Sequence, residues 1–531
     1  MAAAHGSRDF VLEGDASASS DAVQAMAGAP SLDGRLAWAD GSPGRVRVRS
    51  RTWLDTFDWR LYRAGLTLEQ VTGRDRAELV LTGRDGDVLA VERLPADAKP
   101  RWPSLVSALP AGPLRELVEP VAGVRALSVV ARARSRVTEL RALNDDAKTV
   151  ARLAIDRMSV MHPERASAPA RLTLTPVRGY SGVADRIGRA MTSVPGIKPG
   201  RASVLDTALA AAGHRAGDLP GKASSVLLGP SMPASSAMAA ILMALLDALE
   251  ANVPGTVRDV DTEFLHDLRI AVRWTRSALK LCGSALPDGL ALAYRPEFRW
   301  LGDLTTPTRD LDVYLLDFAS MATGLIGATE SELTPFRDYL VRSRAQEYRR
   351  LARGLRSARF ARLTTGWRTA LADVRPARKR PPVGELANVR IRAAQRKALQ
   401  AGQLITAASP SERLHDLRKR CKELRYLVEM FGSLHDPAQH RQAVRELKAL
   451  QNCLGEFQDA EVQRTEIRAF AAQMLADRSA PAATLLAMGE IAAGLARRQR
   501  AARGQFDSRF ADFASPASQA RLTELARTAA A

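Results

Sequence analysis

The chain has 531 residues, of which 46% are hydrophobic and 5% aromatic, and its formal net charge is +19 at pH 7. This length exceeds that of a usual single domain, so we expect two or three domains with substantial cores. The charge indicates a polyanionic partner, which could be a nucleic acid, a polyphosphate or an acidic membrane surface.

Cysteine usage and apolar stretches bear on the compartment. Cys282, Cys421 and Cys453 are too few and too scattered for a disulfide framework, and none has a metal-ligand spacing. Residues 1–41 lack a basic start followed by an apolar run, so no secretory signal is expected. The most apolar stretch, 237–246, is too short to cross a bilayer. We therefore expect a cytoplasmic protein without a membrane span, and neither a metal nor a cofactor.

The composition and periodicity of the sequence change within the first third of the chain. Residues 1–42 are rich in Ala, Gly, Ser and Asp without a steady period, which predicts a flexible leader. Residues 43–190 have the patterns of strands, beginning with the strict alternation of arginine in 45–51, and Arg-Asp-Gly-Asp at 84–87 is a hairpin signal. Strands are expected at about 77–91, 127–134, 137–143, 150–155 and 171–175, with a helix at 114–118.

Within this β-rich segment, Leu54-Asp-Thr and the following Arg60-Leu-Tyr-Arg-Ala-Gly-Leu-Thr-Leu68 resemble the CYTH family of triphosphate-tunnel metalloenzymes. That family opens with a strand of alternating glutamates that binds metal and triphosphate, and we find no such strand before Arg45. The late strand that should carry paired glutamates reads Leu172-Thr-Leu-Thr175. Because metal-dependent triphosphate hydrolysis requires carboxylates, the resemblance implies a degenerate antiparallel β-rich (α+β) barrel without that catalysis.

Arginines in this segment leave two possibilities open. They could bind a phosphate chain, or they could form a polar strand face in solvent. The residues concerned are Arg45, Arg47, Arg49, Arg132, Arg134 and Arg136.

Frequent Pro and Gly at 191–233 predict a linker, and from 234 to 515 the period is helical. Proline at 307 and at 437 is expected in breaks between helices. The expected helices are at about 235–252, 259–283, 293–304, 308–323, 331–356, 359–373, 384–406, 411–431, 438–453, 457–475, 481–510 and 515–529.

The helical segment contains an internal repeat. Phe264-Leu-His-Asp-Leu-Arg269 recurs as Arg413-Leu-His-Asp-Leu-Arg418, 149 positions later. At the same offset, Leu301, Asp310, Asp312 and Val313 correspond to Leu450, Asp459, Glu461 and Val462. One offset for two separated blocks indicates a duplicated helical unit, at about 259–313 and 408–462.

These paired motifs resemble the CHAD family, the conserved histidine α-helical domain, over about residues 230–515. The resemblance implies an all-α domain of two pseudo-symmetric bundles that binds inorganic polyphosphate along a basic surface and has no established catalytic role. It also implies a possible place on polyphosphate granules.

Basic helix faces are the candidate site. On a helical wheel His266, Arg269, Arg273, Arg276 and Lys280 fall in one stripe, opposite an apolar face. Like charges at this spacing destabilise an isolated helix by roughly 0.2–0.5 kcal/mol per pair, so a bound anion would relieve the helix. A solvated basic face remains the alternative for each stretch. The candidate polyphosphate-binding residues are His266, Arg269, Arg273, Arg276, Lys280, Arg349, Arg353, Arg390, Arg396, Lys397, His415, Arg418, Lys419, Lys422, Arg425 and Tyr426.

Two residue classes near these faces have competing interpretations. His266 and His415 could donate to phosphate, in which case binding should tighten as the pH falls from about 7.5 to 6, or they could be packing residues. We expect the acidic residues of the repeated blocks to orient the arginines rather than to bind a metal; these residues are Asp310, Asp312, Asp459 and Glu461.

Three functions remain in view. The leading hypothesis is non-catalytic binding of inorganic polyphosphate. The alternatives are a metal-dependent triphosphatase or polyphosphatase of the CYTH type and a nucleic-acid-binding protein. The scarcity of aromatic residues on the basic faces argues against the last, because single-strand binders stack bases on aromatic rings.

Overall fold

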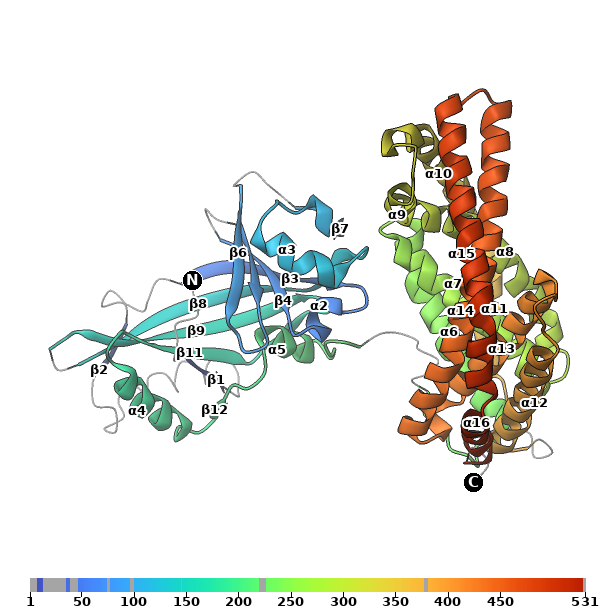
Figure 1. Cartoon of the computed structure of the whole chain (residues 1–531). Coiled ribbons are helices and arrows are strands. Elements are labelled where there is room, and N and C mark those ends of the chain that lie inside the picture. The colour runs from blue at the N-terminus through green and yellow to red at the C-terminus, as the bar shows by residue number, and fades with distance from the viewer. Residues whose placement is uncertain are drawn as a thin grey trace. The chain divides into compact units, whose positions relative to one another are not determined.

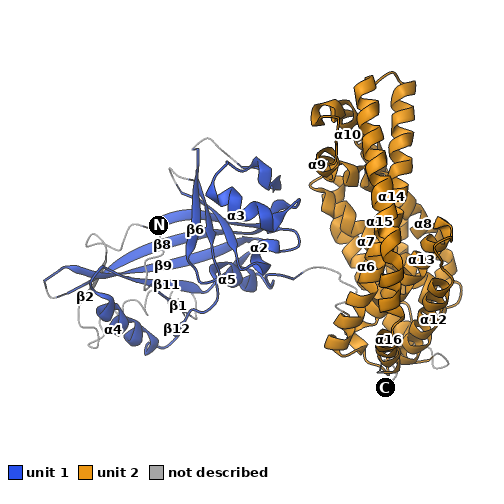
Figure 2. Cartoon of the chain, viewed as in Figure 1, with its two compact units in different colours: residues 1–219 blue, residues 220–531 orange. Residues whose placement is uncertain are grey.

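The computed structural model describes residues 7–12, 35–38, 46–73, 77–95, 100–144, 146–218, 226–376 and 381–528. The chain divides into two compact units, Met1–Leu219 and Pro220–Ala531 (Figure 2). The boundary lies within the segment 191–233 that the sequence marks as a linker. Arg45, one of the arginines considered above, and most of the expected leader lie outside the described residues.

The first unit is an antiparallel sheet, as predicted (Figure 1). Its hydrogen-bonded path runs β12-β1-β11-β9-β8-β3-β4-β5-β6, and β2, β7 and β10 pair with β8 or β9 beside this path. The strands are β1 (Arg8–Leu12), β2 (Arg35–Trp38), β3 (Arg47–Thr56), β4 (Thr67–Thr72), β5 (Ala77–Thr82), β6 (Val88–Leu94), β7 (Ser104–Leu105), β8 (Ala126–Leu143), β9 (Thr149–His162), β10 (Ala166–Ser167), β11 (Ala170–Pro176) and β12 (Ile197–Pro199).

Helices pack on this sheet over three apolar clusters. The short α2 (Arg60–Arg63) and α3 (Pro113–Ala122) pack beside β3 to β6, around Leu61, Leu68 and Leu114. Ile187 and Met191 of α4 (Ser181–Thr192) join Leu153 and Leu172 of the sheet. Leu205 and Leu209 of α5 (Val204–Ala211) pack against Trp53 and Met158.

Three expectations for the first unit need correction. Part of the expected flexible leader forms a strand, because β1 pairs with β11 and β12, although β1 carries none of the alternating glutamates of the CYTH family. This strand is not predictable from its residues alone, because five residues are too few to display a period. In the expected linker, β12 and α5 belong to the sheet unit, since their apolar side chains are buried in its clusters.

The third correction concerns the arginine set. Cross-strand partners in an antiparallel sheet project to the same face. Arg49 pairs with Ser135, whereas Arg134 pairs with Ser50. Arg47 and Arg49 therefore lie on one face and Arg132, Arg134 and Arg136 on the other, so these residues do not form one surface.

The second unit is helical, as predicted. Its helices are α6 (Ala234–Val257), α7 (Thr262–Cys282), α8 (Leu290–Leu316), α9 (Phe318–Thr323), α10 (Thr334–Leu355), α11 (Ala358–Ala372), α12 (Val383–Gln403), α13 (Ser411–Met430), α14 (Pro437–Ala476), α15 (Ala482–Ala514) and α16 (Pro516–Thr528). The last helix lies beyond the expected domain end at 515 and packs on the same core through Leu522 and Leu525.

Both copies of the repeat contribute to one core. Leu268, Val272 and Leu279 of α7 are buried, as the wheel predicts, and so are their repeat equivalents Leu417, Cys421 and Val428 of α13. The two repeat helices thus turn corresponding apolar faces into a common interior. A second cluster, with Phe336 of α10 and Ile467 of α14, fills the far end of the unit.

Two expected helix breaks do not occur. Residues 293–304 and 308–316 form the single helix α8 with Pro307 inside it, and 438–453 and 457–475 form the single α14. Proline at 307 leaves the carbonyl of residue 303 without its helical donor. Asp303 is exposed, so water can satisfy that carbonyl.

Helix α6 is long and apolar enough to cross a membrane by length and composition, and half of its most apolar window is buried. Its side chains Ile241, Leu245 and Leu249 belong to the core shared by the two repeats.

Candidate anion-binding pocket

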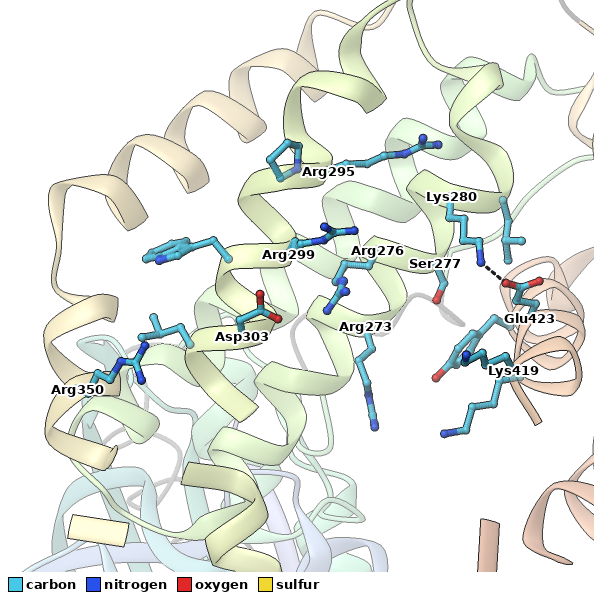
Figure 3. A pocket seen from close by; sticks show the side chains of 16 residues that line it. Arg273, Arg276, Ser277, Lys280, Arg295, Arg299, Asp303, Arg350, Lys419 and Glu423 are labelled. Atoms are coloured by element: carbon cyan, nitrogen blue, oxygen red, sulfur yellow. Dashed lines mark hydrogen bonds and ion pairs between the residues drawn. The ribbon is translucent and has the colours of Figure 1, made fainter. Parts of the chain in front are cut away.

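A cavity of about 980 Å³ lies among α7, α8, α10 and α13 (Figure 3). The residues that line it are Arg273, Arg276, Ser277, Lys280, Leu281, Arg295, Pro296, Arg299, Trp300, Asp303, Leu304, Arg350, Lys419, Lys422, Glu423 and Tyr426. Eight of these side chains are basic and two are acidic. Both copies of the repeated helix contribute, so the duplication brings two separate stretches of sequence to one site.

The two repeat helices are held beside each other at this pocket. The rings of Trp274 and Tyr426 are 5.3 Å apart between centroids, and Lys280 Nζ lies 2.5 Å from Glu423 Oε1 across the helices. Helix α7 is fixed at its start by Asp261, whose side chain accepts hydrogen bonds from the backbone N–H groups of residues 263 and 264.

The basic residues of the pocket differ in their partners. Lys280 pairs with Glu423, Lys419 with Asp416 at 3.3 Å, and Arg350 with Glu347 at 3.7 Å. Among the residues that the structure describes, no ion pair is formed by Arg273, Arg276, Arg299 or Lys422. These four cations are available to an anionic ligand.

Arg276 also approaches the backbone of α8 closely. A Cβ placed on Gly302 would lie 2.5 Å from Arg276 Nη1, so only glycine at 302 leaves room for the guanidinium in this position. The exposed Arg276 and Arg299 side chains reach the same space between α7 and α8 (Figure 3).

Burial and neighbouring cations act on Lys422. Burial, followed by the charges of Arg418 and Arg273, lowers the pKa of the Lys422 ammonium to about 8. Near neutral pH this amine is therefore mostly charged but loses its proton far more readily than an exposed lysine. A bound polyanion would favour the charged form.

Six of the candidate residues from the sequence line the pocket: Arg273, Arg276, Lys280, Lys419, Lys422 and Tyr426. Arg269 and Arg418, which begin the two ladders, do not. Arg269 Nη1 donates to Thr305 Oγ1 at 3.1 Å and Thr306 Oγ1 at 2.7 Å, and burial lowers its pKa to about 10. Arg418 Nη2 donates to Asp459 Oδ1 at 2.8 Å. Both attach a repeat helix to the helix that follows it.

The remaining candidates lie outside the lining. Arg425 is 3.7 Å from Glu429, with its guanidinium over the ring of Tyr426. Arg390 donates to Ser284 Oγ at 2.8 Å. The exposed residues Arg349 and Arg353 lie on α10, and Arg396 and Lys397 lie on α12.

Neither repeat histidine lines the pocket. His415 Nδ1 is 2.7 Å from Gln458 Oε1 of α14, so the ring links two helices. His266 is half-buried. The packing interpretation therefore fits the position of His415 better than contact with a ligand in this pocket.

Two of the four acidic residues of the repeated blocks, Asp312 and Asp459, bind arginines, whereas Glu461 forms no ion pair with an arginine among the described residues. Asp459 accepts from Arg418, and its repeat equivalent Asp310 is close enough to Arg269 to feel its charge, although burial raises the pKa of Asp310. Asp312 accepts from Arg344 Nε at 2.7 Å. The described residues contain no group of three or more His, Cys, Asp or Glu side chains placed to hold a metal ion.

Three basic residues of the pocket were missed from the sequence: Arg295, Arg299 and Arg350. Arg295 and Arg299 are four residues apart on α8, but no dense basic run surrounds them. Arg350 lies in the basic stretch 342–368, where nothing in the sequence separates it from its eight neighbouring arginines.

The first unit does not fit the metal that the CYTH resemblance implies. Asp9 of β1 accepts from Arg171 and Thr173, each at 2.7 Å. Glu69 accepts from Arg51 at 2.5 and 2.8 Å, and Asp156 accepts from Arg51 at 3.3 Å. These carboxylates already neutralise arginines, whereas Mg²⁺ needs carboxylate oxygens free to coordinate it.

Fold and pocket together define an all-helical unit with a cationic cavity between two copies of one helix. Residues 240–468 of this unit match the family model of the CHAD domain. The protein therefore contains a CHAD domain, which confirms the expectation from the paired Leu-His-Asp-Leu-Arg motifs.

Solved structures also resemble parts of the chain. The CHAD domain from the plant Ricinus communis has 23% identity and a TM-score of 0.45, over 54% of this chain and 96% of that chain. PptA from Streptomyces chartreusis has 18% identity and a TM-score of 0.42, over 52% and 99%. A putative adenylate cyclase from Bacillus halodurans has 9% identity and a TM-score of 0.25, over 37% and 95%. The comparison with curated proteins found no match.

Proposed function

We propose that this protein binds inorganic polyphosphate in the pocket of its CHAD domain, without catalysing a reaction there. The observation that carries the proposal is the convergence of eight basic side chains on one cavity that holds two acidic ones. Four of the eight, Arg273, Arg276, Arg299 and Lys422, form no ion pair among the described residues. Bringing these cations together is unfavourable unless an anion neutralises them.

The chemistry of the side chains suits a chain of phosphates. Arginine offers two parallel donors to phosphate oxygens, and such charge-assisted hydrogen bonds are about twice as strong as neutral ones. Each cation that contacts a phosphate also releases a condensed counterion, so several contacts in series add to the affinity. A pocket with cations on four helices can contact several units of a chain.

Nucleic acid is the competing polyanion, and the arrangement of the aromatic rings at the pocket argues against it. Tyr426 packs against Trp274, and Arg359 lies 4.3 Å from the centre of the Trp300 ring. These rings already have partners within the protein, so they offer little face for a base to stack on.

A competition experiment tests the ligand. Labelled long-chain polyphosphate is bound to the full chain at about 150 mM salt, and unlabelled polyphosphate or single- and double-stranded DNA is added at equal phosphate concentration; salt is held constant because both ligands bind through charge. We expect polyphosphate to compete at least about tenfold better than either DNA. Preference for DNA would exclude the proposal.

A phosphate-release assay tests the enzymatic alternative. The full chain is incubated with tripolyphosphate and Mg²⁺ or Mn²⁺, and free phosphate is measured. We expect no turnover above the protein-free control, because Asp9, Glu69 and Asp156 are engaged by arginines. Turnover that is abolished by Glu69→Gln would establish a catalytic first unit.

The proposed ligand also gives an expectation for location. A cytoplasmic protein of this kind should be recovered with polyphosphate granules. A fluorescent fusion that stays evenly distributed in cells containing such granules would argue against a granule association.

A further inference from the structure

One face of the sheet in the first unit carries a row of arginines that the helical pocket does not involve. Arg132, Arg134 and Arg136 are alternate residues of β8, and all three are exposed. On β9, Arg157 pairs directly with Arg136. Because cross-strand partners share a face, these four arginines form one surface, called here the β8–β9 arginine row.

On the opposite face of the same strands, the arginines form ion pairs. Arg51 donates to Glu69 and Asp156, and Arg47 to Glu139 at 3.4 Å. Glu139 of β8 and Asp156 of β9 project to that opposite face, because Val137 pairs with both Arg47 and Asp156 and Glu139 lies two residues beyond Val137. The β8–β9 arginine row has no carboxylate beside it on these three strands.

None of the four arginines in the row forms an ion pair with a described residue. Nε of Arg157 is buried and has no hydrogen-bond acceptor. Residues two apart in a strand are separated by about 6.8 Å, and like charges placed directly opposite each other destabilise a sheet. An anionic chain lying along the row would relieve this repulsion.

The neighbours of the row indicate which polyanion it suits. Ser50 pairs with Arg134 from β3, and Ser159 pairs with Arg134 from β9. These hydroxyls can donate to phosphate oxygens. The positions on this face between Val48 and Thr52, and their partners on β8, include no Phe, Tyr or Trp on which a base could stack. A phosphate chain without bases fits this surface better than a nucleic acid.

We propose that the β8–β9 arginine row is a second binding site for polyphosphate, separate from the pocket of the helical unit. This inference rests on the proposed function of the helical pocket. Each arginine that contacts a phosphate releases a counterion, so a long chain that follows the whole row binds more tightly than a short one.

The test compares ligands of two lengths and three variants of the full chain. Tripolyphosphate presents only three phosphates to a site, whereas a long-chain preparation can follow the whole row. The row variant is Arg132→Gln/Arg134→Gln/Arg136→Gln. Its matched control removes three exposed arginines elsewhere on the same unit, Arg84→Gln/Arg93→Gln/Arg101→Gln, and so changes the net charge equally. The pocket variant is Arg276→Gln/Arg299→Gln.

For long-chain polyphosphate we expect the row variant to lose at least about tenfold in affinity at this second site and the control variant less than about twofold. Calorimetry with tripolyphosphate should give one site fewer for the row variant and an unchanged Kd for the remaining site. Arg136→Gln alone removes the like-charge pair with Arg157 and should fold at least as well as the unmodified protein, so it provides a second measurement if the triple variant is unstable.

Equal affinities of the row and control variants for the long chain would overturn the second site. Loss of RNA binding in the row variant, with polyphosphate binding unchanged, would also overturn it and assign the surface to nucleic acid. The proposed function of the pocket fails separately, if the pocket variant binds tripolyphosphate as tightly as the unmodified protein.

Discussion

The internal repeat supplies a matched control for the pocket. Arg276 and Arg299 line the cavity, and the residues 149 positions later are Arg425 and Lys448. Those equivalents lie outside the lining, and Arg425 already has Glu429 at 3.7 Å. Changing either pair to glutamine removes the same charge from corresponding positions of the two repeats.

We predict that Arg276→Gln/Arg299→Gln weakens polyphosphate binding by about a hundredfold. A hydrogen bond to a charged group contributes about 1.5–3 kcal/mol. Both side chains are exposed, so the lower figure applies to each, which gives about 3 kcal/mol, or about a hundredfold in Kd. The Arg425→Gln/Lys448→Gln control should lose less than about fivefold, since it changes only the general field.

Fluorescence anisotropy with labelled polyphosphate at several salt concentrations measures both the loss and its origin. Two lost phosphate contacts should reduce the slope of log K against log salt by about 1.4, and the control should leave this slope nearly unchanged. Equal losses and equal slopes for the two variants would refute the pocket as a site and indicate attraction by diffuse charge.

Further expectations concern the pH dependence, the acidic residue of the pocket and stability. Lys422 has a pKa of about 8 in the unliganded protein. The affinity for polyphosphate should therefore be constant below about pH 7 and fall by up to tenfold per pH unit as the pH rises through 8. Lys422→Arg should flatten this profile, and an unchanged profile in the variant would assign the titration to another group. Glu423→Gln should tighten binding by about twofold to tenfold by releasing Lys280, whereas Glu412→Gln, on the exposed side of α13, should not; weaker binding by Glu423→Gln would contradict this reasoning. Arg269→Gln should lower the free energy of unfolding by about 1–3 kcal/mol in urea, because its partners Thr305 and Thr306 lose a charged donor, and should affect binding less than Arg276→Gln. Burial lowers the pKa of His435 to about 4, so the unfolded chain binds the proton more readily than the folded protein. The free energy of unfolding should therefore fall as the pH drops from 6.5 towards 4. His435→Leu should remove this loss, and acid sensitivity that persists in the variant would point to another group.

Much of the helical unit follows from local patterns in the sequence. Leu268, Val272 and Leu279 recur at helical spacing and are buried, and the constant offset between the repeats identifies two copies of one helix. A buried face must pack against something, and each copy offers the other a matching face. The sequence could therefore predict that the repeats share a core.

Which residues line the pocket was harder to predict, because a helical wheel gives the direction of a side chain on its own helix but not the other helices that surround it. Arg269 and Arg276 lie in the same stripe, but α8 crosses over the first and leaves the second exposed. Arg299 lies outside any dense basic run and Arg350 lies among many arginines of one basic stretch, so only their placement in three dimensions identifies them.

The two repeats have diverged in a way that a comparison of motifs alone does not reveal. Lys280 of α7 corresponds to Glu429 of α13, and Glu429 is paired with Arg425. The second ladder is thereby partly neutralised by its own chain, while the first continues onto Arg299 of α8. The cation-rich part of the pocket belongs mainly to the first repeat.

In the first unit, β1 was missed because a five-residue strand carries too little pattern, although its pairing with β11 is what brings Asp9 to Arg171. The separation of Arg49 from Arg134 depends on the register of β3 against β8, which long-range pairing decides. The alternation of residues within one strand does not show which residues of the neighbouring strand project to the same face of the sheet.

The most direct measurement is a structure of the full chain with a bound phosphate oligomer of defined length. The account predicts phosphates within hydrogen-bond distance of Arg273, Arg276, Arg299 and Lys422, between the two repeat helices. Phosphates found only on Arg349 and Arg353, on Arg396 and Lys397, or nowhere on the helical unit would contradict it.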